Sequence, residues 1–332
     1  MTSDTQPDDA PDVSFVVIGY NEAATVGACL RSVREADLDG LRTEILYVDG
    51  GSTDGSADIA RRAGADHCLG GERRRRAAEN RNLGLSHASG QFVQFLDGDM
   101  QLAPGWIRAG MEALEKHPEA AAVWGRMREV NSSIYYRALQ LDWEFPEGPS
   151  LYCGGAALFR RAPLAEIGGF PEDVAYGEEP YLCWRIRNEL RMQVLHLHAP
   201  MVEHDLAYRG LRDYLRRNVR CGETYAEIAA RCRHTADPLW AREVRGLLAW
   251  VAAAAAAMAL LITGPWYASA AILLLIPALL TRKTIQFLRR GNSFAVALLY
   301  ALHTYTSKFS IAYGVLRHWF RRRAARESRL RR

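Results

Sequence analysis

The sequence lacks two features that would place its chain outside the cytoplasm. Its six cysteines include no Cys-x-x-Cys spacing. Its first twelve residues are polar and acidic and contain no apolar core, so we expect no signal peptide and interpret residues 1–12 as a disordered lead. Together these absences predict reduced thiols in a cytoplasmic domain.

A third absence concerns dinucleotide cofactors. No Gly-x-Gly-x-x-Gly motif follows the first expected strand, residues 13–18, and this argues against a dinucleotide-binding protein. What the sequence does contain is a repeated order of elements. The apolar runs 13–18 and 44–48 each end in a polar turn that leads into an amphipathic helix. This order predicts an α/β fold with a mostly parallel sheet and its functional loops along one edge.

A short apolar run at residues 92–96 is typical of a buried strand, and it carries Asp97 and Asp99 to its C-terminal end. That end of a strand is where ligands bind in open α/β sheets. Two carboxylates flanking Gly98 form a hard oxygen site suited to Mg²⁺ or Mn²⁺ held partly by substrate phosphates. The alternative interpretation is an acidic turn that caps the next helix.

Polar turns also follow the other expected strands. Asp49 and Asp54 offer acceptors for a nucleobase N–H or for ribose hydroxyls, although Ser52 or Asp54 would equally serve as a helix cap. Arg81 is a candidate to meet a diphosphate, because it lies on the helix before the Asp97 strand. The run Arg73–Arg76 is interpreted as a solvated basic face.

Several short motifs follow one another in a fixed order. They are Gly19-Tyr-Asn-Glu22, Val48-Asp-Gly-Gly-Ser-Thr-Asp-Gly55, Asn80-Arg-Asn-Leu-Gly84, Leu96-Asp-Gly-Asp99, Cys153-Gly-Gly155, Ile167-Gly-Gly-Phe170 and Gly177-Glu-Glu-Pro-Tyr-Leu-Cys-Trp-Arg-Ile-Arg187. Each motif alone is weak, but the ordered set resembles glycosyltransferase family 2, whose members are inverting enzymes of GT-A fold that use nucleotide sugars. The resemblance covers roughly residues 13–230.

The resemblance implies a set of site residues. The implied nucleotide-sugar contacts are Asn21, Glu22, Asp49, Asp54, Arg81, Asp97, Gly154 and Gly155. The implied ligands of a divalent Mg²⁺ or Mn²⁺ ion are Asp97, Asp99, Gln101 and His204. Glu179 is implied as the general base that removes the acceptor hydroxyl's proton, with Glu178 as its partner and the other candidate. The family usually has Asp as the second member of this pair, so the side chain here is longer. The alternative for Glu178 is a structural role in the first turn of a helix.

Three histidines near the end of the resemblance suggest a metal at first sight. The spacing of His196, His198 and His204 is not that of a common structural zinc site, and His196 and His198 alternate on a strand face. We therefore interpret these two as packing residues. His204 stays a candidate metal or diphosphate contact by resemblance.

The C-terminal part changes composition. We expect the catalytic domain at 13–205, amphipathic interfacial helices at 206–245, membrane segments at 246–316 and a basic cytoplasmic tail at 317–332. Residues 247–263 and 266–281 are uncharged and near the short end of the roughly 17 to 25 residues that cross a bilayer. The alternative is a buried helical hairpin in a soluble protein.

The distribution of basic residues sets the expected membrane topology. Arginine and lysine lie on both flanks of the hairpin, so both flanks should face the cytoplasm. The third apolar stretch, 294–316, contains His303 and Lys308, and crossing would put the basic tail outside; we expect an interfacial or re-entrant helix instead. We expect the tail to contact anionic lipids and no nucleic acid to bind.

The sequence thus predicts a multi-pass enzyme of the cytoplasmic membrane with its catalytic domain in the cytoplasm. It would transfer a sugar from a nucleotide donor, with UDP-linked sugars expected, to a hydroxyl of a lipid-linked or membrane-associated acceptor, as in cell-envelope glycolipid or exopolysaccharide synthesis. Residues 214–222 are similar to the segment that carries Gln-x-x-Arg-Trp in processive family members but lack that glutamine and tryptophan, which argues against a processive polymer synthase. One alternative is a polyprenyl-phosphate glycosyltransferase similar to dolichol-phosphate mannose synthase. Another is an inactive membrane scaffold of the same fold.

Overall fold

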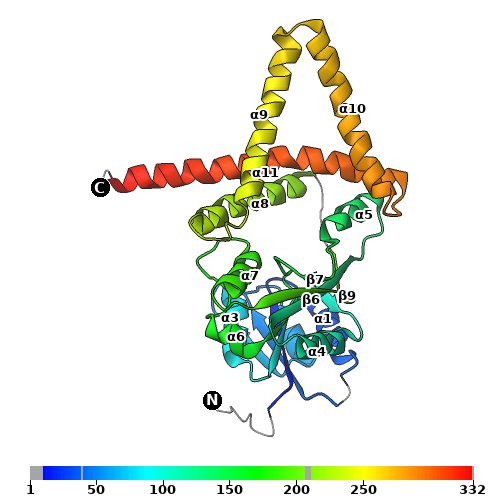
Figure 1. The fold of residues 1–332 in the computed structure, drawn as a ribbon. Coiled ribbons are helices and arrows are strands. Elements are labelled where there is room, and N and C mark those ends of the chain that lie inside the picture. Colours follow the sequence, from blue (N-terminus) through cyan, green and yellow to red (C-terminus); the bar gives the residue numbers. More distant parts are fainter. Residues whose placement is uncertain (1–9, 39, 206–210, 331–332) are drawn as a thin grey trace. The chain divides into compact units, whose positions relative to one another are not determined.

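The structure is a computed structural model that describes residues 10–38, 40–205 and 211–330. The chain divides into two compact units (Figure 1). The sheet unit is Met1–Val130 with Trp143–Leu206, and the helical unit is Asn131–Asp142 with Ala207–Arg332. Most of the expected disordered lead lies outside the described residues, as do residues 206–210 and 331–332.

One nine-stranded sheet forms the core of the sheet unit. Its strands are β1 Val13–Gly19, β2 Thr43–Asp49, β3 His67–Gly70, β4 Phe92–Asp97, β5 Met100–Leu102, β6 Ala120–Glu129, β7 Gly148–Pro149, β8 Leu158–Arg160 and β9 Gln193–His204. The order across the sheet is β3-β2-β1-β4-β8-β6-β9-β5, with β7 paired to β9. This confirms the expected α/β class.

The sheet is parallel in its first half and mixed in its second. Strands β3, β2, β1 and β4 run parallel, and so do β6 and β9. Strand β8 is antiparallel to both β4 and β6, and the short strands β5 and β7 are antiparallel to β9. The mixed half carries the Gly154-Gly155 segment and His204 toward the C-terminal end of β4.

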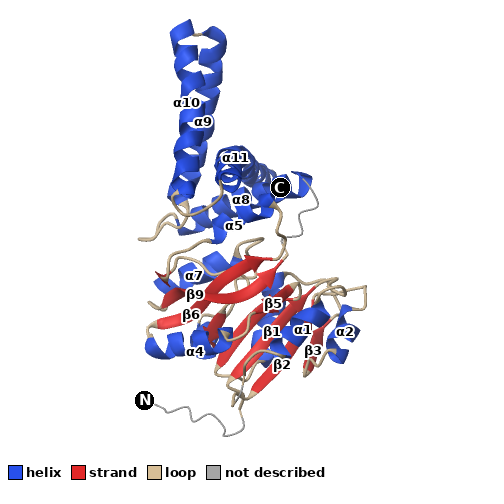
Figure 2. Cartoon of the chain, turned by 90° about the vertical axis from the view of Figure 1, so that its right-hand side faces the viewer, coloured by secondary structure: helices blue, strands red, loops and turns tan. Residues whose placement is uncertain are grey.

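Helices cover both faces of the sheet, with α1 and α4 on one face and α3, α6 and α7 on the other (Figures 1 and 2). The helices are α1 Val26–Arg34, α2 Ser56–Arg62, α3 Ala77–His87, α4 Trp106–Lys116, α6 Arg161–Glu166 and α7 Glu178–Asn188. Because helices cover both faces, the sequences of the central strands are continuous apolar runs. All seven residues of β1 are buried, as the run 13–18 predicts.

One pairing places the candidate metal residues. Strand β5 follows β4 after a two-residue turn and pairs antiparallel with the end of β9, so that Met100 lies opposite His204. Asp99 directly precedes Met100, and its side chain is therefore brought beside His204. A contact between residues this far apart in sequence follows from strand order rather than from any local motif.

The helical unit is entirely α-helical apart from a 3₁₀ turn, Leu141–Trp143, at its border within the described residues. Its helices are α5 Ile134–Gln140, α8 Leu211–Cys232, α9 Ala241–Thr263, α10 Trp266–Leu288 and α11 Phe294–Leu330. Helix α11 packs along α8 and also contacts α5, α9 and α10. Residues 317–330 of the expected basic tail are part of this helix. Arg317 and Arg321 pair with Glu223 on α8.

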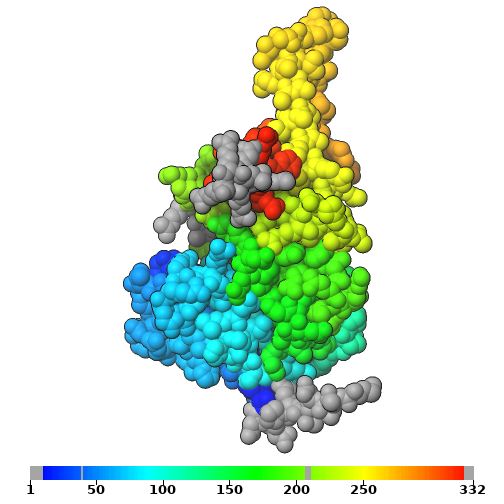
Figure 3. Space-filling model, turned by 90° about the vertical axis from the view of Figure 1, so that its left-hand side faces the viewer, coloured from blue at the N-terminus to red at the C-terminus, as the bar shows by residue number. Residues whose placement is uncertain are grey.

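Two described helices, α9 and α10, are long and apolar enough to cross a membrane. Both extend beyond the apolar runs, because α9 begins at Ala241 and α10 continues to Leu288. Their apolar side chains are largely exposed, with Ile262 76% and Trp266 81% accessible. The hairpin stands out as a column of atoms without a covering layer in the space-filling view (Figure 3). This exposure argues against a soluble helical hairpin, whose apolar side chains would be buried.

Candidate functional site

Two neighbouring glutamates begin helix α7. Gly177 adopts a left-handed conformation, with φ of 80°, and starts the helix at Glu178. Glu178 and Glu179 thus lie in its first turn, where the helix dipole favours negative charge. Their side chains are only 14% and 17% exposed. The pair is therefore a partly buried, doubly acidic helix start.

Arg81 of helix α3 joins this pair to the end of strand β4. Its side chain is 2% exposed, and its Nη2 lies 2.9 Å from Asp97 Oδ1. Its Nη1 lies 3.0 Å from an oxygen of Glu178 and 3.0 Å from an oxygen of Glu179. One guanidinium therefore faces three carboxylates. Arg81 was predicted to meet a diphosphate; in this structure its charge is engaged by the chain itself.

The excess of negative charge shifts the pKa values in the cluster. Burial, together with the charge of Glu178, raises the pKa of Glu179 to about 7, although Arg81 opposes the shift. Burial also raises the pKa of Asp97, again against the effect of Arg81. Burial alone would lower the pKa of Arg81, but its three carboxylates raise it. Glu179 is thus able to take up a proton near neutral pH.

The glycine pair 154–155 passes close to the cluster. A Cβ added to Gly155 would lie 2.8 Å from Arg81 Nη2 and 3.0 Å from Asp97 Oδ2. A Cβ on Gly154 would meet only Trp143, at 4.0 Å. Of the two predicted glycines, Gly155 is the one whose lack of a side chain the cluster requires.

A thiol contact fastens this glycine segment to helix α7. The Sγ atoms of Cys153 and Cys183 lie 3.3 Å apart, and both side chains are buried. All six cysteines are free, in line with the expected reduced thiols. The contact holds the backbone of Gly155 beside the first turn of α7.

Asp99 and His204 form a second group on the other side of Asp97. His204 Nε2 lies 3.3 Å from Asp99 Oδ2. Asp99 Oδ1 and His204 Nδ1 are buried without a hydrogen-bond partner. Burial alone would lower the pKa of His204, but Asp99 raises it. Such unpaired buried atoms require an explanation. A cation at Asp99 would supply one for its Oδ1, but not for His204 Nδ1, because Nε2 is the ring nitrogen that faces Asp99.

The remaining predicted metal residue, Gln101, is exposed on β5 between the buried Met100 and Leu102. Within the described residues, no group of three His, Cys, Asp or Glu side chains is gathered closely enough to hold a metal ion. Asp99 and His204 alone would therefore provide only part of a coordination sphere. Such a partial site suits Mg²⁺ or Mn²⁺, which retain waters and bind substrate phosphates.

Hydrogen bonds join the loop after β1 to the loop after β2. Asn21 Oδ1 accepts from the Thr53 amide at 2.9 Å, and Asp54 Oδ2 accepts from the Ala23 amide at 2.9 Å. Asp49 is buried, and its Oδ2 accepts from the Ser52 amide at 2.9 Å. The predicted nucleoside residues therefore shape one paired loop at the strand ends.

Glu22 lies between this loop and the metal candidates. Its backbone amide donates to Ser56 Oγ at 2.8 Å. Burial and the nearby charge of Asp99 raise the pKa of its carboxyl, although Thr25 hydrogen-bonds to it. Glu22 thus adds a further carboxylate beside Asp97 and Asp99.

Sequence reasoning missed the loop before α3, which it interpreted as a solvated basic face. Arg74 covers the ring of Tyr20 with its guanidinium carbon 3.3 Å from the ring centroid, and its Nη1 donates to the Gly50 carbonyl at 3.3 Å. The position of this loop in the sequence could have identified it as part of the site. The loop follows the C-terminal end of the parallel strand β3, so it belongs to the ligand-binding edge.

His196 and His198 lie away from this edge. The ring of His196 is buried against Trp124, with centroids 4.5 Å apart, and its Nδ1 contacts the Pro146 carbonyl at 3.0 Å. His198 Nε2 lies 3.3 Å from the Phe145 carbonyl. These two histidines hold the segment around residues 145–146 against β9.

Residues 14–168 match the family model for Glycosyl transferase family 2. The pre-mycofactocin glycosyltransferase of Mycobacterium tuberculosis is 30% identical over 259 residues, covering 72% of this chain and 52% of that protein. The poly-β-1,6-N-acetyl-D-glucosamine synthase of Staphylococcus epidermidis is 32% identical over 192 residues, covering 52% of this chain and 45% of that protein. The chain thus spans about half the length of these curated relatives.

A solved structure shares the fold. The mannosyltransferase of Pyrobaculum calidifontis in complex with GDP-mannose and Mn²⁺ superposes with a TM-score of 0.66 at 23% identity, covering 91% of this chain and 88% of that one. The fold therefore defines a protein of the GT-A class. Residues 14–168 of the chain are thus a glycosyltransferase family 2 domain.

Proposed function

We propose that this protein is an inverting glycosyltransferase that moves a sugar from a nucleotide-diphosphate donor to an acceptor hydroxyl. The observation that supports this most directly is Glu179. It is a carboxylate that is only 17% exposed and whose pKa is raised to about 7, at the ligand-binding edge of a GT-A sheet. A general base works best when its pKa lies near the operating pH.

In this proposal the cluster residues have separate tasks. Glu179 removes the proton of the acceptor hydroxyl while the acceptor oxygen attacks the sugar carbon and the nucleoside diphosphate departs. Arg81 is a positioning residue, because it holds Glu178, Glu179 and Asp97 together with contacts of 2.9 to 3.0 Å. Gly155 leaves the space that these side chains fill.

A divalent cation fits the site beside this cluster. Asp99 and His204 offer an oxygen and a nitrogen ligand, and each has a buried atom without a partner. Asp97 and Gln101 would complete the protein's share. When bound, Mg²⁺ or Mn²⁺ would act as a Lewis acid that neutralises the leaving diphosphate.

The paired loops after β1 and β2 would hold the nucleoside. Asn21, Glu22, Asp49 and Asp54 line them, and the exposed Tyr20 ring under Arg74 provides a flat surface for a base. Gly154 would lie against the sugar. We propose UDP as the nucleotide.

The acceptor we propose is lipid-linked or membrane-associated. Helices α9 and α10 are long and apolar enough to cross a bilayer. Arginine and lysine flank them on both ends, which favours a cytoplasmic catalytic domain and contact of the basic α11 end with anionic lipids. A multi-pass anchor would hold the site beside an amphiphilic substrate.

A second candidate is transfer to a polyprenyl phosphate. The sequence Asp97-Gly-Asp-Met-Gln101 favours it, because it is similar to the corresponding motif of dolichol-phosphate mannose synthases. A phosphate acceptor is already ionised and requires no base. The partly buried Glu178-Glu179 pair therefore favours the hydroxyl acceptor, and mild-acid lability of the product would instead indicate a sugar phosphate.

Donor binding tests this proposal before any acceptor is known. We expect one of UDP, GDP or TDP to raise the melting temperature of the detergent-purified protein only when Mn²⁺ is present. A ligand at a hundred times its Kd adds roughly 2.7 kcal/mol. Asp99→Asn should abolish the response. Stabilisation by NAD, or by none of the nucleotides with or without metal, would contradict the proposal.

A further inference from the structure

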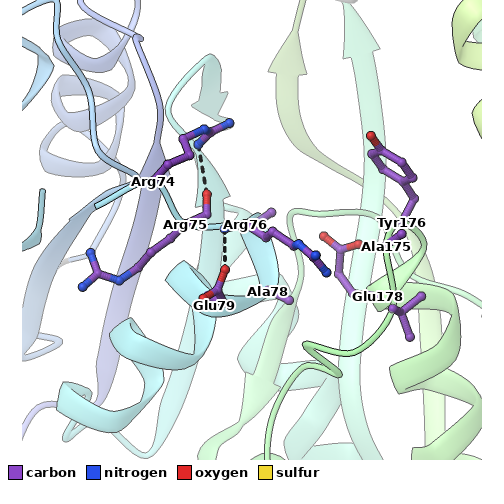
Figure 4. A pocket seen from close by; sticks show the side chains of 10 residues that line it. Arg74, Arg75, Arg76, Ala78, Glu79, Ala175, Tyr176 and Glu178 are labelled. Atoms are coloured by element: carbon purple, nitrogen blue, oxygen red, sulfur yellow. Dashed lines mark hydrogen bonds between the residues drawn. The ribbon is translucent and has the colours of Figure 1, made fainter. Parts of the chain in front are cut away.

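A pocket of about 520 Å³ lies beside the carboxylate cluster, within the sheet unit. One wall is Arg74–Arg76 with the first turn of α3, and the other is the 174–178 segment that leads into α7. Arg76 extends across the pocket toward Glu178 and Tyr176, whereas the guanidinium of Arg75 points the opposite way (Figure 4). The pocket therefore adjoins Glu178 of the proposed catalytic pair.

The acidic side chains of this pocket are already paired. Glu79 Oε1 lies 2.8 Å from Arg73, and its Oε2 accepts from the Arg76 amide at 2.8 Å. Glu178 lies 3.0 Å from Arg81. Glu79 is thus paired by Arg73, whereas Glu178 shares Arg81 with Glu179 and Asp97.

The basic side chains are not compensated in the same way. Arg75 pairs with Glu72 at 3.0 Å. Among the described residues, no carboxylate lies within ion-pair distance of Arg74 or Arg76. The guanidinium of Arg76 donates only to the Glu172 carbonyl, at a long 3.4 Å. Arg74 is held by the Tyr20 ring and by the Gly50 and Arg75 carbonyls. Arg76 therefore brings an exposed guanidinium without a carboxylate partner to the N-terminal end of α3, and a guanidinium at a helix N-terminus is a setting for a phosphate.

We propose that this pocket binds a phosphate group of the acceptor, so that the acceptor is a phosphorylated carrier with a free sugar hydroxyl. The proposal rests on the proposed function. The donor's diphosphate would be provided for by Asp99 and His204 with their cation, whereas this pocket is lined by Glu178, the neighbour of Glu179 on α7. Its volume exceeds that of a phosphate and leaves room for the sugar whose hydroxyl Glu179 would deprotonate.

Binding of inorganic pyrophosphate to the full chain in detergent, measured by calorimetry with EDTA present, tests the pocket without the metal site. Arg76→Gln should weaken binding roughly tenfold to a hundredfold, as the loss of a charge-assisted contact does. Arg76→Lys should restore part of it. The control is Arg62→Gln on exposed α2, which removes the same charge outside the pocket and should bind as wild type.

A competition experiment with nucleotides distinguishes the donor from the acceptor as the source of the phosphate. Saturating UDP, GDP or TDP with Mn²⁺ should leave pyrophosphate binding unchanged. Displacement by the nucleotide would assign the pocket to the donor's diphosphate and overturn the acceptor proposal. Equal pyrophosphate affinity in wild type and Arg76→Gln, or no binding to wild type at millimolar concentration, would overturn the pocket itself.

Kinetic measurements distinguish failure of this inference from failure of the proposed function. With a membrane lipid extract as acceptor, Arg76→Gln should raise the acceptor KM about tenfold or more and leave the donor KM unchanged. A raised donor KM with an unchanged acceptor KM would overturn the inference. If no sugar is transferred under any condition but pyrophosphate binding still depends on Arg76, the proposed function fails and the anion pocket stands.

Discussion

At the scale of single residues, the proton affinity of Glu179 follows from its neighbours. Glu178 adjoins it on α7, while Arg81 on α3 and Asp97 on β4 face it from two other elements. Burial and the two acids outweigh Arg81, so the pKa is raised to about 7. The pKa values of these residues are coupled, because one guanidinium contacts all three carboxylates.

This shift predicts the pH dependence of transfer. A protonated Glu179 cannot accept the hydroxyl proton, so kcat/KM should rise about tenfold per pH unit below a pKa of about 7 and level off above it. The same shift stabilises the fold below the ordinary pKa of 4.5, and that contribution is lost as the pH rises through about 7. Initial rates between pH 5.5 and 9 provide the check. A flat profile from pH 5.5 to 8 would contradict the assigned base.

Gly155 offers a steric test of the same cluster. A methyl group there would lie 2.8 Å from Arg81 and 3.0 Å from Asp97. Gly155→Ala should therefore lower the free energy of unfolding by roughly 1 to 3 kcal/mol through overpacking and reduce transfer strongly. Gly154→Ala is the matched control, with its nearest neighbour at 4.0 Å, and should unfold close to wild type. Equal melting temperatures for the two variants would refute the close approach.

The sequence identifies the acidic residues of the site but not the residues that they contact. Asp97 and Asp99 are predictable because they end an apolar run, and strand ends gather at one edge of a parallel sheet. The ion pair between Arg81 and Glu178 joins positions 97 residues apart. No local pattern encodes such a contact, so a residue expected to meet a phosphate turns out to be engaged by carboxylates.

At the scale of elements, helices α8 and α11 cross at two glycines. A Cβ on Gly222 would lie 1.9 Å from the Ile311 carbonyl oxygen, and one on Gly314 would lie 2.1 Å from the Val219 carbonyl oxygen. The backbones therefore touch directly. A bidentate pair from Arg317 to Glu223, with contacts of 2.7 Å, lies beside this crossing.

Gly222→Ala should consequently force the two helices apart. We expect a loss of roughly 1 to 3 kcal/mol or more in the free energy of unfolding, measured by thermal denaturation in detergent. Gly246→Ala on α9 is the control, because nothing lies within 4 Å of its added Cβ and alanine favours a helix over glycine. A Gly222→Ala protein as stable as this control would rule out the crossing.

Helix boundaries show where sequence patterns stop being informative. Apolar runs locate the cores of α9 and α10, but the helices continue through charged residues such as Arg242 and Arg282, which are good helix formers. The same holds for the expected basic tail. In the structure its residues 317–330 belong to α11, and Arg317 and Arg321 pair with Glu223 on α8.

At the scale of the whole molecule, charge and hydropathy fix the expected topology. Basic residues flank the α9–α10 hairpin on both ends, and α11 carries arginines at its end. A C-terminal epitope tag should therefore be removed by protease in sealed inverted vesicles and protected in right-side-out vesicles. Protection in inverted vesicles would mean that α11 crosses the membrane.

The central claim is that Glu179 is the base of a nucleotide-sugar transferase. The most direct measurement is transfer of radiolabelled sugar from UDP-, GDP- and TDP-linked donors into a membrane lipid extract, comparing wild type with Glu179→Gln and Glu178→Gln. We predict transfer from one donor class, and a loss of roughly 10²-fold or more in Glu179→Gln with donor affinity retained. Near wild-type transfer by Glu179→Gln, with loss in Glu178→Gln, would move the base by one residue. Wild-type rates in both variants would contradict the account.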